Sequence, residues 1–239
     1  MADRLKDRLA LITGASRGIG RAVALSLAAE GAHVILVART VGGLEDVDDE
    51  IQKAGGKATL VPLDLTDYDG LDRLGATIFE RWGKLDILVG NAGILGPLTP
   101  VGHISPDEWD KVMAVNVTAN WRLIRSLDPL LRRSDAGRAV FVTSGAAQKC
   151  RPYWGPYSAT KAALNAIVKT WANETLKTDM KINLLSPGPV ATKMRAKAMP
   201  GEDPETLTRP SDLAPLFLDL VSPECTRHGD IVSYQKPAT

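Results

Sequence analysis

The sequence has little of several features that would mark out particular protein classes. Only two cysteines, Cys150 and Cys225, occur in 239 residues, without the number of a disulfide scaffold or the spacing of a metal site. No apolar run approaches the ~18 to 20 residues of a membrane-spanning helix. No apolar stretch follows a basic start, so we expect no secretory signal. These absences predict a cytoplasmic protein with no membrane partner.

An excess of charge of one sign is also absent. The chain carries 29 basic and 28 acidic residues, a formal net charge of +1, and its longest basic pair is Arg132-Arg133. We therefore expect neither a nucleic-acid face nor a polybasic membrane patch. The three histidines, His33, His103 and His228, are scattered without metal-ligand spacing or an evident nucleophile to pair with, so we predict no metal site.

What is present is an alternation of short apolar runs with segments of helical periodicity. We expect strands at 9–13, 34–38, 58–61, 85–89, 139–143, 181–185 and, as a seventh, 231–233. Most of these runs are apolar without alternation, which is typical of strands covered on both faces. We expect helices at 18–30, 42–54, 156–177 and 211–221, and one that starts after Ser105 and runs to about Arg132.

This alternation predicts an α/β fold: a single doubly wound Rossmann-type domain over residues 1–239. It would have a parallel sheet of about seven strands with helices on both faces. No linker, repeat or low-complexity tract interrupts it. The segment 193–209 is the least regular part, and we predict that it is a mobile substrate loop.

A glycine-rich turn lies between the first strand and the first helix. It reads Thr13-Gly14-Ala15-Ser16-Arg17-Gly18-Ile19-Gly20, with the glycines spaced G-x-x-x-G-x-G. Glycine allows positive φ and close approach of the backbone to a pyrophosphate. The N-terminus of the following helix offers free N–H groups and the positive end of its dipole. The turn therefore predicts a dinucleotide-binding site.

The end of the second strand indicates which dinucleotide. Enzymes that prefer NAD usually carry an acidic residue there for the ribose 2′-hydroxyl. Here the strand ends Val37-Ala38-Arg39-Thr40. Arg39 and Arg17 together suit a 2′-phosphate, so we predict NADP(H) as the cofactor, the alternative being that either arginine is a solvated surface charge.

Tyr157 and Lys161 lie four residues apart at the start of a predicted helix, so they share a face. A free tyrosine has a pKa of about 10, and lowering it toward neutrality needs a nearby cation. Lys161, together with the charge of a nicotinamide, would supply one. Ser144 ends the fifth strand, where ligands of parallel sheets bind, so its hydroxyl could hydrogen-bond to a substrate carbonyl.

In these features the chain resembles the short-chain dehydrogenase/reductase family, in its shorter single-domain branch, over nearly the whole length. The turn at 13–20 is similar to the family's cofactor fingerprint. Asn91-Ala92-Gly93 is similar to its N-N-A-G element, with Gly90 in place of the first Asn. Ser144, Tyr157 and Lys161 match the catalytic Ser and Tyr-x-x-x-Lys, and Asn116 matches a fourth catalytic residue.

The resemblance implies that Asn116 interrupts its helix and holds a water that continues a proton relay from Lys161. It also implies that Asp64-Leu65 contacts adenine and that the loop from Pro187 holds the nicotinamide carboxamide. The expected cofactor-binding residues are Gly14, Ser16, Arg17, Gly18, Ile19, Gly20, Arg39, Thr40, Asp64, Leu65, Asn91, Ala92, Gly93, Tyr157, Lys161, Pro187, Gly188, Val190 and Thr192.

The implied activity is hydride transfer between NADP(H) and a small-molecule carbonyl or alcohol, with Tyr157 as proton donor or acceptor. One alternative is a 3-oxoacyl-(acyl-carrier-protein) reductase, whose docking patch would be Arg122, Arg125, Arg132 and Arg133. Another is a non-catalytic NADP(H)-binding sensor or scaffold. A pocket beyond Thr192 would be lined by Leu95, Tyr153, Trp154, Met194 and Met199, although ordinary packing explains these residues equally well.

Subunit association is also expected. The helices that carry Asn116 and Tyr157 match those that commonly pair between subunits of the family, which implies a homodimer or homotetramer. The family's C-terminal V-D-G-G ending is replaced here by residues 229–234, which makes a tetramer less assured.

Overall fold

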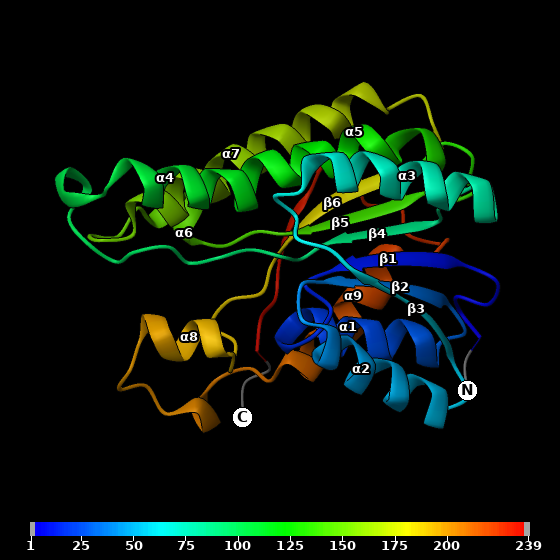
Figure 1. Cartoon of the computed structure of the whole chain (residues 1–239), viewed down its shortest axis with the longest axis horizontal. Coiled ribbons are helices and arrows are strands. Elements are labelled where there is room, and N and C mark those ends of the chain that lie inside the picture. Colours follow the sequence, from blue (N-terminus) through cyan, green and yellow to red (C-terminus); the bar gives the residue numbers. More distant parts are fainter. Residues whose placement is uncertain (1–2, 237–239) are drawn as a thin grey trace.

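The computed structural model describes residues 3–236, which form an α/β fold around one parallel sheet (Figure 1). The strands are β1 (Leu9–Thr13), β2 (His33–Ala38), β3 (Lys57–Pro62), β4 (Ile87–Gly90), β5 (Arg138–Val142), β6 (Lys181–Ser186) and β7 (Ile231–Ser233). Their order in the sheet is β3-β2-β1-β4-β5-β6-β7, and each neighbouring pair is parallel. The predicted doubly wound, Rossmann-type sheet of seven strands is confirmed.

Helices cover both faces of this sheet, as predicted (Figure 1). On one face lie α1 (Gly18–Ala29), α2 (Val41–Lys53) and α9 (Ala214–Val221), and on the other α3 (Tyr68–Trp82), α5 (Ala119–Leu131) and α7 (Gly155–Glu174). Three shorter helices, α4 (Pro106–Met113), α6 (Ala146–Lys149) and α8 (Lys193–Ala198), extend the molecule at one end. None of the described helices is long and apolar enough to cross a membrane.

The strands have apolar side chains on both sides because both sides are covered. Along β1, Leu9 and Leu11 pack with the helices α3, α5 and α7, whereas Ala10 and Ile12 pack with α1, α2 and α9. All four are at most 4% exposed. This is the reason that the strand sequences are continuous apolar runs without polar alternation.

Two parts of the chain are more regular than the sequence analysis anticipated. Helix α3 lies between β3 and β4, where no helix was predicted. Asp67 caps its start by accepting a hydrogen bond from the Gly70 N–H, and Gly83 ends it at φ +74°. The segment 193–209, predicted to be the least regular part of the chain and a mobile substrate loop, contains the short helix α8, which Thr192 caps. Its mobility remains a prediction.

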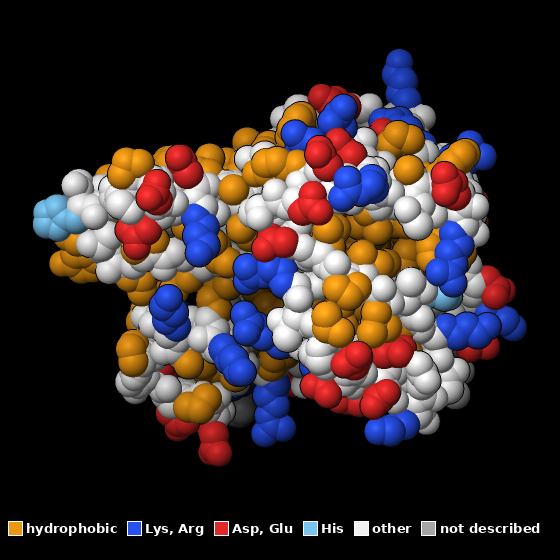
Figure 2. Space-filling view, viewed as in Figure 1, with side chains coloured by type: hydrophobic (Ala, Val, Ile, Leu, Met, Phe, Trp, Pro, Cys, Tyr) orange, Lys and Arg blue, Asp and Glu red, His pale blue; other side chains and the backbone are white. Residues whose placement is uncertain are grey.

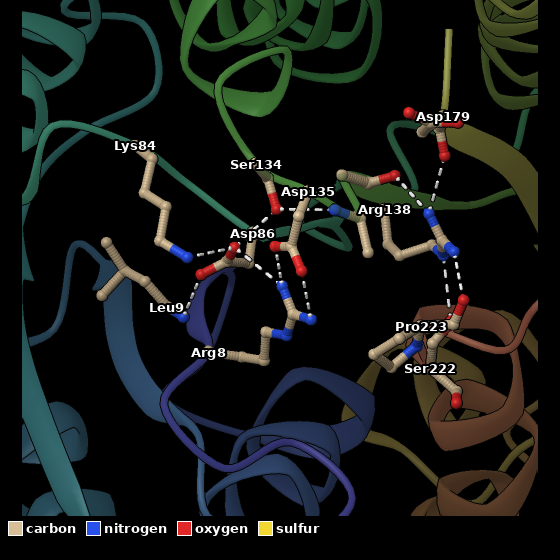
Figure 3. A network of polar contacts seen from close by, with 12 residues as sticks. Arg8, Leu9, Lys84, Asp86, Ser134, Asp135, Arg138, Asp179, Ser222 and Pro223 are labelled. Atoms are coloured by element: carbon tan, nitrogen blue, oxygen red, sulfur yellow. Dashed lines mark hydrogen bonds and ion pairs between the residues drawn. The ribbon is translucent and has the colours of Figure 1, made fainter.

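A polar network joins the amino ends of β1, β4 and β5 (Figure 3). The fully buried carboxylate of Asp86 accepts hydrogen bonds from the Leu9 N–H at 2.9 Å, from Lys84 Nζ at 2.8 Å and from Ser134 Oγ at 2.5 Å. Arg8 bridges Asp86 and Asp135. Because Asp86 is buried but paired on every side, the network fixes this edge of the sheet.

The same edge holds Arg138, whose guanidinium is nearly buried among backbone carbonyls (Figure 3). It donates to the carbonyl oxygens of Gly137, Asp179, Ser222 and Pro223. These bonds tie β5 to the segments before β6 and after α9. The opposite edge of the sheet, at the carboxyl ends of the strands, is left for a functional site.

Candidate active site

The residues predicted to form the site gather at the carboxyl edge of the sheet. The chain runs outward from β1 to β2 and β3, and then returns to place β4 on the other side of β1. Ligands of open parallel sheets bind at such a reversal point, because the two adjacent loops diverge there and leave a crevice. The glycine turn after β1 and the Asn91–Gly93 segment after β4 lie side by side at this point.

The glycine turn has the backbone conformation that its sequence requires. Gly14 has φ +66° and Gly18 has φ +58°, a region that other residues rarely adopt. A Cβ on Gly20 would collide with the Gly14 carbonyl, so only glycine lets α1 approach the turn this closely. Helix α1 begins after Arg17 with no side-chain cap and no acidic residue in its first turn. Its N–H groups are thus available to an anionic ligand.

The turn is held against β4 by Thr13 and Asn91. The Asn91 side-chain amide donates to the Thr13 carbonyl at 2.9 Å, and the Thr13 hydroxyl accepts from the Asn91 and Ala92 N–H groups at 3.0 and 3.1 Å. Asn91 therefore shapes the crevice. Gly90 departs from the family's pattern, and the structure explains why a glycine is needed here: a Cβ at this position would collide with the Phe141 ring.

Arg39, Thr40 and Asp64 lie at the ends of β2 and β3. Arg39 is 62% exposed and its guanidinium lies 3.6 Å from the Asp64 carboxylate. Hydrogen bonds from Thr66, together with Arg39, hold the pKa of Asp64 below its usual value. Thr40 is the residue before the first turn of α2. Arg17 is likewise exposed, so both predicted phosphate ligands can reach solvent.

Ser16 and Leu65 complete the predicted adenosine side of the crevice. Helix α2 begins Val41-Gly42-Gly43, and a Cβ on Gly43 would lie 3.0 Å from Cβ of Ser16, so the glycine lets α2 lie against the turn. Leu65 is 7% exposed and packs in the core. In Figure 2, Lys and Arg side chains gather around the recess between the lobe of α4 and the lobe of α8. A positive rim of this kind attracts phosphate groups.

The predicted catalytic side chains of Tyr157, Lys161 and Ser144 come together at the end of β5. Tyr157 and Lys161 lie on one face of α7, and Lys161 Nζ is 5.7 Å from the centroid of the Tyr157 ring. Lys161 Nζ donates to the Val142 carbonyl at 2.8 Å, two residues before Ser144. The Ser144 hydroxyl lies near the Tyr157 hydroxyl, and its influence lowers the pKa of Tyr157.

The ionisation of the two α7 residues is governed by burial. Burial raises the pKa of Tyr157, and Ser144 opposes that rise. We expected Lys161 to lower the pKa of Tyr157, but desolvation sets the direction of the shift and Ser144, not Lys161, is the group that opposes it. Burial lowers the pKa of Lys161 to about 8. At neutral pH, Tyr157 is therefore a neutral hydroxyl that can donate a proton, beside a lysine that loses its charge readily.

Asn116 interrupts its helix, as predicted. Residues Ala114–Thr118 form one turn of π-helix between α4 and α5. The side chain of Asn116 is fully buried and bonds to Ile94 in both directions, accepting from its N–H and donating to its carbonyl, each at 2.8 Å. It also donates to Thr160 Oγ1 at 3.1 Å. A π-turn projects one side chain out of register, which is common at functional sites.

The loop after β6 carries the remaining predicted cofactor contacts. Pro187 and Val190 are buried, and Gly188 is exposed at φ +70°. Val190 forms a parallel bridge with Thr208, which closes the base of the segment that contains α8. The Thr192 hydroxyl accepts from the Arg195 N–H at 3.2 Å and so caps α8.

The five residues suggested as pocket lining differ in their surroundings. Leu95 is 6% exposed and packs in the interior, whereas Tyr153 is 57% exposed. Trp154 contacts Tyr157 directly: its ring lies edge-on to the Tyr157 ring, with the centroids 5.8 Å apart. Met194 and Met199 are partly buried on the α8 segment.

These residues fit a nicotinamide dinucleotide. The glycine turn and the open start of α1 suit a pyrophosphate, and the arginines at 17 and 39 suit a further phosphate. Gly93 lies beside two of the predicted catalytic residues. A Cβ on Gly93 would lie 3.2 Å from Asn116 Oδ1 and 3.7 Å from Lys161 Nζ. Across residues 3–236 no group of three or more His, Cys, Asp or Glu side chains is arranged to hold a metal ion.

Sequence reasoning missed several residues that build the site. Thr13 holds the Asn91 loop, Thr160 holds Asn116, and Thr143 bonds to Asn165 next to Ser144 in the chain. One signal was available in the sequence, because Asn165 follows Tyr157 and Lys161 at the same spacing of four. The three threonines carry no such signal, since their partners come from distant elements.

Comparison with known proteins gives a consistent result. A family model described as "short chain dehydrogenase" matches residues 8–203. The "Uncharacterized oxidoreductase YciK" of Escherichia coli (strain K12) is 37% identical over 228 residues, which cover 94% of this chain and 90% of YciK.

Two solved structures are similar over almost the whole chain. A short chain dehydrogenase from Shigella flexneri 2a str. 301, complexed with NADP, has a TM-score of 0.93 at 36% identity and covers 98% of this chain and 99% of its own. One from Escherichia coli CFT073, complexed with NADPH, has a TM-score of 0.92 at 36% identity, covering 99% and 100%. The predicted cofactor agrees with both.

Proposed function

Because the chain belongs to the short chain dehydrogenase family of oxidoreductases, we propose that it is an NADP(H)-dependent enzyme that interconverts a small-molecule carbonyl and the corresponding alcohol. The observation that carries the proposal is the convergence of Tyr157, Ser144 and Lys161 beside the glycine turn. A sensor or scaffold would need the dinucleotide crevice but has no use for a partly buried tyrosine placed beside Ser144 and a buried lysine.

The cofactor assignment rests on the second strand as well as on the relatives. No acidic residue follows β2, and Arg39 and Arg17 are exposed at the rim where a ribose 2′-phosphate would lie. A guanidinium pairs with phosphate through parallel N–H···O bonds. The structures complexed with NADP and NADPH support the same choice.

In the direction of reduction, the glycine turn and Arg39 would hold NADPH, which would supply the hydride for the carbonyl carbon and leave as NADP⁺. Tyr157 gives its hydroxyl proton to the carbonyl oxygen, which becomes the alcohol oxygen as the C=O double bond becomes a single bond. Ser144 hydrogen-bonds to the same oxygen and stabilises the charge that develops on it. Lys161 stabilises the tyrosinate that remains, and the phenol proton is then restored from solvent.

The test is NADPH oxidation over a panel of ketones, aldehydes, quinones and 3-oxoacyl thioesters. We expect turnover with at least one class and a loss of at least about 100-fold in kcat for Tyr157→Phe, with NADPH affinity retained. Tyr68→Phe, which removes the hydroxyl of a tyrosine on α3 that is not among the predicted site residues, is the matched control and should be fully active. Normal turnover by Tyr157→Phe would overturn the role of the tyrosine.

Saturable NADPH binding with no turnover of any carbonyl would instead support a sensor or scaffold. The 3-oxoacyl thioesters in the panel test the alternative that the protein is a 3-oxoacyl-(acyl-carrier-protein) reductase. We also keep the expectation of a homodimer or homotetramer and of a cytoplasmic location as predictions, the first to be checked by light scattering of the purified chain.

A further inference from the structure

Three successive turns of α7 attach to three successive residues at the end of β5. Tyr157, Lys161 and Asn165 are spaced by four, so they form one row on the helix. Lys161 donates a hydrogen bond to the Val142 carbonyl, and Tyr157 lies near Ser144, which lowers its pKa. The third pair is Thr143 with Asn165: Thr143 Oγ1 donates to Asn165 Oδ1 at 2.5 Å.

The Thr143–Asn165 bond is the one member of this row that the proposed mechanism does not use. Thr143 is 2% exposed, and its N–H donates to the Leu185 carbonyl at 2.8 Å, so its backbone is held by β6 and its side chain by α7. Asn165 is partly buried and lies one helical turn beyond Lys161. A buried hydroxyl without an acceptor would destabilise the folded protein. The Thr143–Asn165 pair is therefore a strong constraint on the local geometry.

Ser144 follows Thr143 directly and depends on it for position. The chain leaves the sheet at Val142 and turns at once, with Ser144 Oγ accepting from the Ala146 N–H at 3.1 Å. Ser144 therefore has no strand neighbour of its own. Ser144 is held on one side by the Ala146 and Ala147 N–H groups of the turn and on the other side by Thr143, which β6 and α7 fix. A displacement of about 1 Å is enough to weaken a catalytic hydrogen bond severely.

We propose that Asn165 is a positioning residue, which holds Thr143 and thereby keeps the Ser144 hydroxyl near the Tyr157 hydroxyl. Asn165 does not touch the reacting atoms. The row on α7 thus contains two catalytic side chains and a third that sets the distance between helix and strand. The catalytic part of this inference rests on the proposed function, whereas its geometric part does not.

The geometric part is tested on the ligand-free protein by NMR of ¹³C-labelled tyrosine. The chain has four tyrosines, so the Cζ resonance of Tyr157 can be assigned with Tyr157→Phe. Ser144→Ala defines the resonance without the hydroxyl contact. We expect Asn165→Leu and Thr143→Val each to move the Tyr157 resonance toward its Ser144→Ala position. Asn165→Asp and Thr143→Ser, which retain the acceptor and the donor, should leave it close to wild type.

A structural control separates positioning from general loosening of the fold. Thr175 lies at the far end of α7, fully buried, and its hydroxyl donates to the Trp171 carbonyl at 2.9 Å. Thr175→Val removes a bond of the same kind from the same helix. It should lower the melting temperature comparably without moving the Tyr157 resonance. An unmoved resonance in Asn165→Leu and Thr143→Val would overturn the proposal.

Kinetics test the catalytic part. We expect Asn165→Leu to lower kcat about tenfold while KM for NADPH stays within about twofold, and the double variant with Thr143→Val to be no worse than either single variant. A shifted resonance with unchanged kcat would overturn the catalytic part. Failure of the proposed function would appear separately, as full activity of Tyr157→Phe.

Discussion

Asn116 and Ile94 are joined by two hydrogen bonds of 2.8 Å, one in each direction, between a side-chain amide and a peptide group. The side-chain amide of Asn116 thus satisfies both the N–H and the carbonyl of Ile94, as a neighbouring β-strand would. It can do so because the π-turn at Ala114–Thr118 pushes Asn116 toward the segment that follows β4. The same segment includes Gly93, which borders Lys161.

We therefore expect Asn116→Ala to impair both folding and turnover. It would leave the Ile94 N–H and carbonyl without partners, at a cost of about 3 kcal/mol in the free energy of unfolding. Asn183→Ala is the matched control, since Asn183 is also buried and bonds in both directions, to Arg227 and Asp230, away from the site. Urea unfolding should show similar losses for the two variants. Only Asn116→Ala should lose kcat, and equal kcat in both would contradict this role.

Lys161 should limit the stability of the protein at neutral pH. Its folded pKa of about 8 lies below its ordinary value of 10.5. Between these values the unfolded chain binds more protons than the folded protein, so wild-type stability rises with pH in that window. Below pH 8, where both states carry the charge, the full cost of burying it remains.

Lys161→Met removes this cost, and we expect it to be inactive yet more stable than wild type by about 2 kcal/mol at pH 7. The stability difference should shrink as pH rises from 8 toward 10.5. Urea unfolding at pH 7, 9 and 10 measures it, with Lys169→Met, an exposed position on the same helix, as the control. A constant difference across this range would show that Lys161 does not titrate as described.

Arg39 should decide between the two nicotinamide cofactors. We expect Arg39→Ala to raise KM for NADPH about tenfold and to leave KM for NADH unchanged, because only NADPH has the 2′-phosphate. The effect should weaken at high salt, since Arg39 is 62% exposed. Arg21→Ala is the control, because Arg21 is another partly exposed arginine, paired with Glu50 on α2. Parallel changes in both KM values would reject the assignment.

Asp86 should be needed for stability and irrelevant to cofactor binding. Replacing it by Ala leaves Lys84, Ser134 and the Leu9 N–H facing a buried space without their acceptor. We expect a loss of about 3–5 kcal/mol in the free energy of unfolding. Asp219→Ala, which breaks an exposed pair with Arg4, should cost less than about 1 kcal/mol. Calorimetry on both variants measures these losses of stability. A changed affinity for NADPH in the folded Asp86→Ala variant would contradict the view that the network at the amino ends of the strands is independent of the site at their carboxyl ends.

Much of the fold could be predicted because its signals are local. The apolar strands, the glycine turn before α1 and the four-residue spacing of Tyr157 and Lys161 all lie within short stretches of chain. Helix α3 was missed although its signals are equally local: an Asp67 cap, apolar residues at Leu71, Leu74 and Ile78, and Gly83 at its end. Its charged residues obscured that pattern.

By itself, the sequence determined where the seven strands lie along the chain, the glycine turn and the identity of the predicted catalytic side chains. Tertiary structure alone decided that Asn116 bonds to Ile94, that Thr143 bonds to Asn165 and that burial raises the pKa of Tyr157. The physical reason is the distance along the chain over which each kind of interaction acts. Propensity and turn chemistry act over a few residues, whereas hydrogen-bond partners and desolvation depend on elements that are brought together only when the sheet and its helices pack.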